Sequence, residues 1–340
     1  MKRHFLTLII LFHTSQAFSA SVAKYAGEFM SMGVGARALG MGGAAVAVAN
    51  DVTCGYWNPA GSSRLLYPEI AFMHAEQFAG MVNYDYAGLA LPLPKNAGLT
   101  FSLIRVGVDD IPYTTIPRPD LRQDTVFVDA EGNLVVNRPY VYRTVSDAEY
   151  AAYFGYSRRY DRRTSFGMNA KIVHKGVGDH SAWGIGFDIG VLWNAWRQLK
   201  VGVNLQDATT TLLAWNTSKK ELIAPTLKSG VSYPFLFPKW KSRILFAADA
   251  DMRFEGRNST ADLHWGDVSL NFRLGAEFIL LNSLAVRIGR DDLGCLTAGA
   301  GFALPRLFID YAFMNHTDLK ETHRVSLRLR LEEERFRRKN

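Results

Sequence analysis

From Tyr67 to the C-terminus, the chain consists largely of short segments in which apolar and polar side chains alternate. In one of them every second residue from Leu270 to Phe278 is apolar, and the residues between include Arg273 and Glu277. A period of two is typical of β-strands, because successive side chains of a strand point to opposite faces. The fourteen segments with this pattern are 68–75, 82–91, 97–106, 149–157, 164–174, 184–193, 199–206, 226–235, 243–254, 268–280, 283–290, 296–304, 307–315 and 323–331.

The connections between these segments distinguish two all-β architectures. A soluble β-sandwich turns the apolar faces of its strands inward, whereas a transmembrane barrel turns them toward lipid. Connections after even-numbered segments are mostly short, and they include 92–96, 158–163, 194–198, 281–282 and 305–306. The long connections all follow odd-numbered segments, and they are 107–148, 207–225 and 255–267. This sorting is typical of outer-membrane proteins. We therefore predict an all-β fold, a transmembrane antiparallel β-barrel of about 14 strands over residues 67–332.

The first twenty residues have the composition of a secretory signal peptide. Lys2 and Arg3 precede an apolar run at residues 5–12, and small residues follow up to Ser19 and Ala20. This order predicts cleavage near residue 20 and export from the cytoplasm. Together with the barrel, it predicts location in the outer membrane of a Gram-negative-type cell, with membrane lipid as a partner.

The charge distribution argues against nucleic-acid binding. The net charge of +7 is modest for 340 residues, and much of it lies in a charged C-terminal tail, residues 333–340. No basic stripe is interleaved with aromatic residues, as a nucleic-acid-binding surface would require. Cys54 and Cys295 are the two cysteines, and their separation in sequence does not indicate whether they pair.

Residues 21–66 precede the first strand and are rich in small residues. A barrel of this size is too wide for its own inward side chains to fill, so we predict that residues 21–66 form a hatch in the lumen. Its buried backbone would need hydrogen-bond partners from the wall. The residues expected to hold and gate the hatch are Arg37, Gly40, Gly42, Gly43, Trp57, Asn58, Pro59, Ala60 and Gly61. The charges expected to face the lumen are Asp249, Asp251, Arg273, Glu277, Arg287, Asp310 and Arg328.

Two features of the hatch suggest how it is held. Arg37 is the one charge between Glu28 and Asp51, and a buried guanidinium needs an acceptor. The candidate partners, which the sequence does not rank, are Asp249, Asp251, Glu277 and Asp310. Pro59 fixes a turn, and Asn58 can bond the backbone that follows it. The simpler alternative is that Arg37 faces water and the turn only connects hatch to barrel.

The run GARALGMGGAAVAVANDVTCGYWNPAGSSRL, from Gly35 to Leu65, resembles the N-terminal signature of the PorV/PorQ outer-membrane proteins, members of the FadL-like barrel superfamily. The resemblance implies a hatch ahead of a fourteen-stranded barrel. It extends over essentially the whole mature chain. The superfamily includes a component of the type IX secretion apparatus and relatives of the long-chain fatty-acid transporter. Two departures are Cys54, where a small residue is usual, and the residues after Leu331, where the family's barrel normally ends.

Motifs for catalysis, cofactors and metals are weak or missing from the sequence. Gly33 and Gly35 mimic a dinucleotide-binding turn, but no strand–helix–strand unit surrounds them. The histidines lack metal-ligand spacing, and Ser326 beside His323 has no third member of a triad. We therefore expect no enzyme, no cofactor and no metal site.

Three functions fit the predicted barrel. The resemblance favours a secretion-associated, type IX-like or partner-binding barrel, whose partners would be secretion-machinery proteins. The alternative is FadL-like passive transport of hydrophobic molecules such as long-chain fatty acids, in which the ligand passes the hatch and leaves through the wall. A structural barrel without transport is the third. A pairing gap in the wall beside the hatch would favour lateral transport, and an apolar extracellular surface at 107–148 would favour protein binding.

Overall fold

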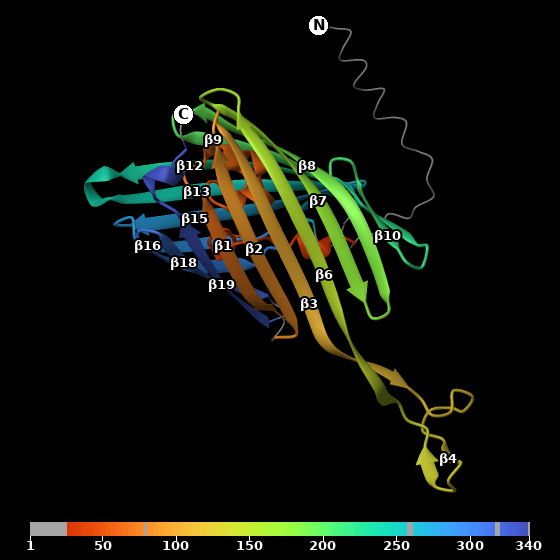
Figure 1. Ribbon diagram of the computed structural model, residues 1–340. Helices are drawn as coiled ribbons and strands as arrows, with labels where there is room; N and C mark the ends of the chain where they lie inside the picture. Colours follow the sequence, from red (N-terminus) through yellow and green to blue (C-terminus); the bar gives the residue numbers. More distant parts are fainter. Residues whose placement is uncertain (1–25, 78–79, 257–260, 317–319, 339–340) are drawn as a thin grey trace, which may run out of the picture.

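The computed structural model describes residues 26–77, 80–256, 261–316 and 320–338 (Figure 1). The predicted signal peptide, residues 1–20, and the first residues of the predicted hatch, 21–25, lie outside the described residues. No helix in the described ranges is long and apolar enough to cross a membrane.

Seventeen strands are hydrogen-bonded into one antiparallel sheet, and fourteen of them form a closed ring. The ring closes where β1 pairs with β19, with Glu69 opposite Arg330. The ring strands are β1 (Glu69–Gln77), β2 (Val82–Leu93), β3 (Ala97–Thr115), β6 (Tyr140–Arg159), β7 (Thr164–Val177), β8 (His180–Trp196), β9 (Leu199–Gln206), β12 (Thr226–Phe237), β13 (Ser242–Arg253), β15 (Val268–Leu280), β16 (Leu284–Arg290), β17 (Leu296–Ala303), β18 (Leu307–His316) and β19 (Lys320–Arg330). Each corresponds to one of the fourteen alternating segments, so the predicted fold class is confirmed.

The remaining strands lie in the long connections. β3 and β6 continue past the barrel as a paired ribbon and carry the hairpin β4 (Val126–Val128) and β5 (Leu134–Val136) at its end (Figure 1). We call residues 108–147 the arm. β10 (Thr211–Trp215), β11 (Lys220–Ile223) and β14 (Leu263–Trp265) extend the wall locally. The sequence thus identified the long connections, but not that they are largely strand.

The two faces of the wall have opposite polarity. In β15, Phe272 and Leu274 are exposed on the outside, whereas Arg273 and Glu277 are buried inside. An apolar exterior and a polar interior are the arrangement of a membrane barrel, and the reverse of a soluble sandwich.

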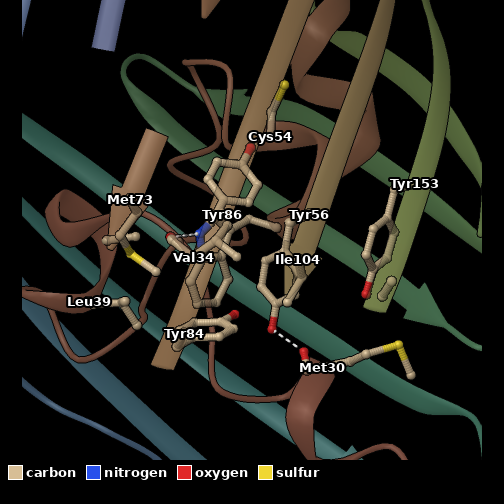
Figure 2. Packing of buried hydrophobic residues seen from close by; sticks show 14 of the residues in the cluster. Met30, Val34, Leu39, Cys54, Tyr56, Met73, Tyr84, Tyr86, Ile104 and Tyr153 are labelled. Carbon is tan, nitrogen blue, oxygen red and sulfur yellow. Dashed lines mark hydrogen bonds between the residues drawn. The ribbon is translucent and has the colours of Figure 1, made fainter. Parts of the chain in front are cut away.

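Residues 26–65, which we call the N-terminal segment, lie inside the ring and are almost entirely buried. The segment is irregular, and its helical turns are η1 (Glu28–Met30), α2 (Ala36–Leu39), α3 (Cys54–Trp57) and η2 (Pro59–Arg64); η3 (Pro238–Trp240) and η4 (Glu334–Phe336) lie elsewhere. α2 ends before Gly40, and α3 ends before Asn58, the residue that precedes Pro59. The segment supplies much of the molecule's apolar core, where Tyr56 packs with Tyr84, Tyr86 and Tyr153 of the wall (Figure 2).

Candidate functional site

The backbone of the N-terminal segment lies directly against the inner wall, and wall glycines make this approach possible. A Cβ added to Gly275 or Gly289 would collide with the backbone at Met41, and one added to Gly202 would collide with Val46. Conversely, Gly42 has a φ of +66°, and a side chain there would strike the carbonyl of Arg290. A backbone contact that leaves no room for a Cβ requires glycine, and a positive φ favours it. The segment is therefore fitted to the wall rather than suspended in a wet lumen.

The predicted small residues of the segment all make such close contacts. Gly40 lies against the backbone of Gly299, Gly43 against the side chain of Arg273, and Gly61 against the carbonyl of Ala49. Ala60 is fully buried, and its amide would be struck by a Cβ on Gly167. A side chain at Gly40 or Gly61 would meet backbone atoms, and one at Gly43 would displace the Arg273 guanidinium.

Arg37, in α2, anchors the segment to the wall. Its Nε donates to Oε1 of Glu277 at 2.8 Å and its Nη2 to Oε2 at 2.9 Å, a bidentate pair. Its Nη1 donates to Asp51 at 3.0 Å and to Asn50 at 2.8 Å. Glu277 was one of four candidate partners, whereas Asp51 and Asn50 were not foreseen. Burial alone would lower the pKa of Arg37, but the charges of Glu277 and Asp51 raise it above the usual value.

Asp51, in the turn after Val48, belongs to the same group of charges as Arg37 and Glu277. Burial alone would raise its pKa, but Arg328 and Arg37 lower the pKa of Asp51 to about 2. Its Oδ1 also accepts from the amide and the hydroxyl of Thr53, at 3.0 and 2.5 Å. The carboxylate is therefore ionised at neutral pH and remains a partner for Arg37.

Asn58 fixes the turn into η2 and also bonds the wall. Its Oδ1 accepts from the amide of Ala60 at 3.2 Å, and its Nδ2 lies 3.1 Å from the carbonyls of Val46 and Val191. Pro59 occupies the first turn of η2, where a missing N–H costs nothing. One side chain thus joins two stretches of the segment to β8.

The paired aromatic residues of α3 hold the upstream chain. The Tyr56 hydroxyl donates to the Met30 carbonyl at 2.6 Å (Figure 2), and Trp57 Nε1 donates to the Val34 carbonyl at 2.9 Å. Their rings pack edge to face at 4.9 Å. Both are fully buried, so their polar atoms need these acceptors.

All seven charged residues expected to face the lumen are buried, and their contacts fall into separate groups. Glu277, Arg287 and Asp310 form a chain of ion pairs at 2.9 and 2.8 Å that includes Arg37. Arg273 pairs with Asp251 at 3.1 Å, together with Asp292, at a second place. Asp249 accepts from the amides of Ala45 and Val46 at 2.7 and 2.9 Å, and Arg328 pairs with Glu69 at 3.2 Å.

Sequence reasoning missed further buried charges. Lys171 pairs with Asp188 at 3.0 Å and Asp207 at 2.8 Å. Lys228 is buried with its Nζ 3.6 Å from Asp251 and without a hydrogen-bond partner in the part of the chain that the structure describes. The alternation of their strands would have placed Lys171, Asp188 and Lys228 on the inner face.

The wall is interrupted beside the start of the N-terminal segment. β8 pairs with β9 up to Leu205 and then with β10 from Leu212, so residues 207–210 form a turn that interrupts the regular ladder. Within this turn, the amide of Ala208 still donates to the carbonyl of Phe187 in β8 at 2.8 Å. Residues 224–225, between β11 and β12, lie opposite this break. Asp207 and Thr210 have φ values of +53° and +59°, and such a conformation is strained for β-branched Thr. We call this place the wall break.

A small cavity of about 40 Å³ lies between the wall break and η1. Gly27, Met30, Asp207, Ala224 and Lys228 are among its lining residues. A Cβ on Gly27 would lie 2.9 Å from Cγ2 of Ile223, so η1 is in contact with β11. The cavity has room for about one water molecule, and η1 therefore covers the wall break from inside.

The C-terminal tail folds back onto the segment at the other end. The Arg338 guanidinium donates to the carbonyls of Ser62, Ser63 and Ala97, the first at 3.2 Å and the last at 2.6 Å. Burial and the nearby Arg159 lower the pKa of Arg338 to about 10, so it stays protonated at neutral pH. It binds the carbonyl end of η2, where cations are favoured.

Neither cysteine is in a disulfide: Cys54 is buried in the core and Cys295 is partly exposed. In the described ranges no three His, Cys, Asp or Glu side chains are grouped as metal ligands.

Comparison with known proteins identifies the fold. No protein-family model matches the chain, and no curated protein matches it in sequence. Among solved structures, the chain is similar to the CymD monoaromatic hydrocarbon channel, with a TM-score of 0.54 and 11% identity over 91% of this chain and 98% of that chain. It is also similar to the Pseudomonas putida toluene transporter TodX, with a TM-score of 0.54 and 12% identity over 87% of this chain and 96% of that chain. The chain thus has the fold of these outer-membrane channels, a closed fourteen-stranded β-barrel.

Proposed function

We propose that this protein is an outer-membrane channel for the passive uptake of hydrophobic small molecules, with the N-terminal segment as its hatch. The observation that carries the proposal is the wall break, which η1 covers from inside. A ladder without unpaired residues offers no lateral exit, whereas a four-residue departure from it leaves a place where the wall can open. The fold shared with CymD and TodX, described as hydrocarbon channels, supports the same function.

The tight seating of residues 40–61 argues for exit through the wall rather than along the barrel axis. Backbone in contact with wall glycines cannot yield to a solute without a shift of many contacts at once. η1 is held by individual side-chain hydrogen bonds to carbonyls, among them Tyr56 to the Met30 carbonyl and Lys175 to the Ala26 carbonyl at 3.2 Å. In the proposed route, η1 moves, the cavity enlarges, and the solute leaves between residues 207–210 and 224–225.

A reversible lock tests this route. Gly27→Cys with Ile223→Cys, in a Cys295→Ser background, places two thiols where η1 touches β11, close enough for a disulfide. We expect cells with the oxidised variant to take up labelled toluene at the rate of cells without the protein, and reductant to restore uptake. The single-cysteine variants are the matched controls and should be insensitive to oxidant.

Unchanged uptake in the oxidised, fully cross-linked variant would refute the route through the wall break. Wild-type uptake equal to that of cells lacking the protein would refute the transport function itself.

A second candidate function is a secretion-associated, partner-binding barrel of PorV/PorQ type. The observation that favours it is the arm, which exposes Val128, Leu134, Val141 and Tyr142 beyond the barrel (Figure 1). Replacing residues 116–139 by a short Gly-Ser linker separates the two functions. A transporter should keep its toluene uptake, whereas a partner-binding barrel should lose the proteins that cross-link to it in intact cells.

A further inference from the structure

A second cavity opens at the barrel end opposite the arm. It has a volume of about 230 Å³ and is lined by Asn282 and Ser283, at the turn between β15 and β16. Because strands alternate in direction, this turn lies at the end away from the β3–β6 connection. We call this cavity the rim pocket. It is distinct from the small cavity at η1, with which it shares no lining residue.

Five arginines line the rim pocket, and they outnumber the carboxylates that line it. Two of the cavity's lining residues are acidic, Glu277 and Asp310. One arginine comes from the N-terminal segment and four come from β13, β16 and β19 of the wall, and they are Arg37, Arg243, Arg287, Arg328 and Arg330.

Glu277, at the floor, has no acceptor capacity left. Its Oε1 accepts from Nε of Arg37 at 2.8 Å and Nε of Arg287 at 2.9 Å. Its Oε2 accepts from Nη2 of Arg37 at 2.9 Å and faces Nη2 of Arg243 at 3.4 Å. A carboxylate offers about four lone-pair positions, and all four are used.

Because Glu277 has no free acceptor position, Arg243 has N–H donors that no acceptor in the described part of the chain uses. Among the described residues, its guanidinium contacts one carboxylate, that of Glu277 at 3.4 Å, and its Nε is buried without a hydrogen-bond partner. The others have closer acceptors: Arg287 reaches Asp310 at 2.8 Å, and Arg330 reaches Glu69 at 2.7 Å. A buried, unpaired guanidinium N–H is costly, and the fork of Arg243 matches a planar carboxylate.

The rim pocket also has apolar lining residues. Phe308 lies under the guanidinium groups of Arg328 at 3.9 Å and Arg330 at 4.9 Å, and Ile279 and Phe302 also line the cavity. Stacked arginines hold the ring in place. The cavity therefore combines guanidinium donors with an aromatic ring and other apolar side chains.

We propose that the rim pocket binds a small organic carboxylate, with the carboxylate on Arg243 and the apolar body against Phe308. The site goes beyond passage of hydrocarbons, because it selects for a negative charge and lies at the other end of the N-terminal segment. Its size is below the roughly 300–1,000 Å³ of pockets for drug-sized ligands, which favours acids as small as benzoate.

Calorimetric titration of the detergent-solubilised protein with sodium benzoate tests the site. We expect saturable binding to wild type, about tenfold or more weaker binding to Arg243→Gln, and no binding of benzyl alcohol, which has the ring without the charge. Arg306→Gln is the matched control: it removes an exposed arginine of the same rim that does not line the pocket, and it should bind benzoate like wild type.

Equal benzoate affinity of wild type and folded Arg243→Gln would overturn the proposal, as would displacement of benzoate by equimolar inorganic phosphate, which lacks an apolar body. Heat-dependent gel migration establishes that each variant is folded. Toluene uptake by Arg243→Gln should match wild type, so failure of the carboxylate site and failure of the transport function give different results.

Discussion

At the scale of single residues, the attachment of the N-terminal segment converges on Glu277. The carboxylate is fully buried and receives three guanidinium groups, one from the segment and two from the wall. Burying such a charge is tolerable because every acceptor position is used. The same completeness makes the two close partners, Arg37 and Arg287, hard to remove, since the loss of either leaves charge uncompensated.

Arg37→Ala is expected to loosen the segment while the barrel still assembles. Removing one partner of a buried ion pair costs about 3–5 kcal/mol, and here both Glu277 and Asp51 lose the guanidinium of Arg37 as a partner. The measurement is conductance in planar lipid bilayers, which should rise above that of wild type. Arg306→Ala, at an exposed position, is the control. Wild-type tightness in an assembled Arg37→Ala barrel would mean that Arg37 does not hold the segment.

At the scale of elements, η2 is held from two sides. Asn58 and Pro59 fix its start, and its end is bound by arginines from distant parts of the chain: Arg338 to Ser62 and Ser63, and Arg159 to Ser63 at 3.3 Å. A short 3₁₀ turn does not persist alone. The tail therefore contributes to the conformation of the segment, an unexpected role for residues that follow the last strand.

Arg338→Ala should release the end of η2 without altering the barrel. We expect faster hydrogen exchange at the amides of residues 60–65, because the carbonyls of Ser62, Ser63 and Ala97 each lose one donor. Arg337→Ala removes the neighbouring charge, which is exposed and pairs with Glu334 at 3.5 Å, and should leave exchange unchanged. Identical exchange in both variants would show that the tail is not a clamp.

At the scale of the whole molecule, the structure is a barrel turned inside out relative to a soluble protein and filled by its own N-terminal segment. The filling explains why polar side chains inside are paired rather than solvated. It also means that substitutions on the inner face disturb contacts with the segment: Ser326, for example, accepts a hydrogen bond from the amide of Ala36 at 2.7 Å.

Phe272→Arg on the outer face of β15 should destabilise the barrel by about 2–4 kcal/mol if the position lies near the bilayer midplane. Phe272→Leu, which keeps the face apolar, should cost much less. Urea unfolding in lipid vesicles, followed by tryptophan fluorescence, measures both. If the outer face of the barrel were in contact with water instead of lipid, Phe272→Arg would cost no more than Phe272→Leu.

The alternation of residues by itself determined the fourteen strands and which face of each is polar. That information is local, since slipping a strand by one residue exchanges all its side chains between faces. Connection lengths then distinguished a barrel from a sandwich. The enrichment of residues 33–43 in glycine indicated close backbone contact, but not with which part of the wall.

Tertiary structure alone decided the partners. Arg37 lies 240 residues from Glu277 in the chain, and four acidic residues were equivalent candidates until ring closure fixed which one faces it. The wall break between β9 and β10, the clamp by Arg338 and the surplus donors of Arg243 depend in the same way on contacts between distant strands. Periodicity encodes the direction in which a side chain points, whereas the neighbour it meets depends on how the closed barrel and its filling fit together.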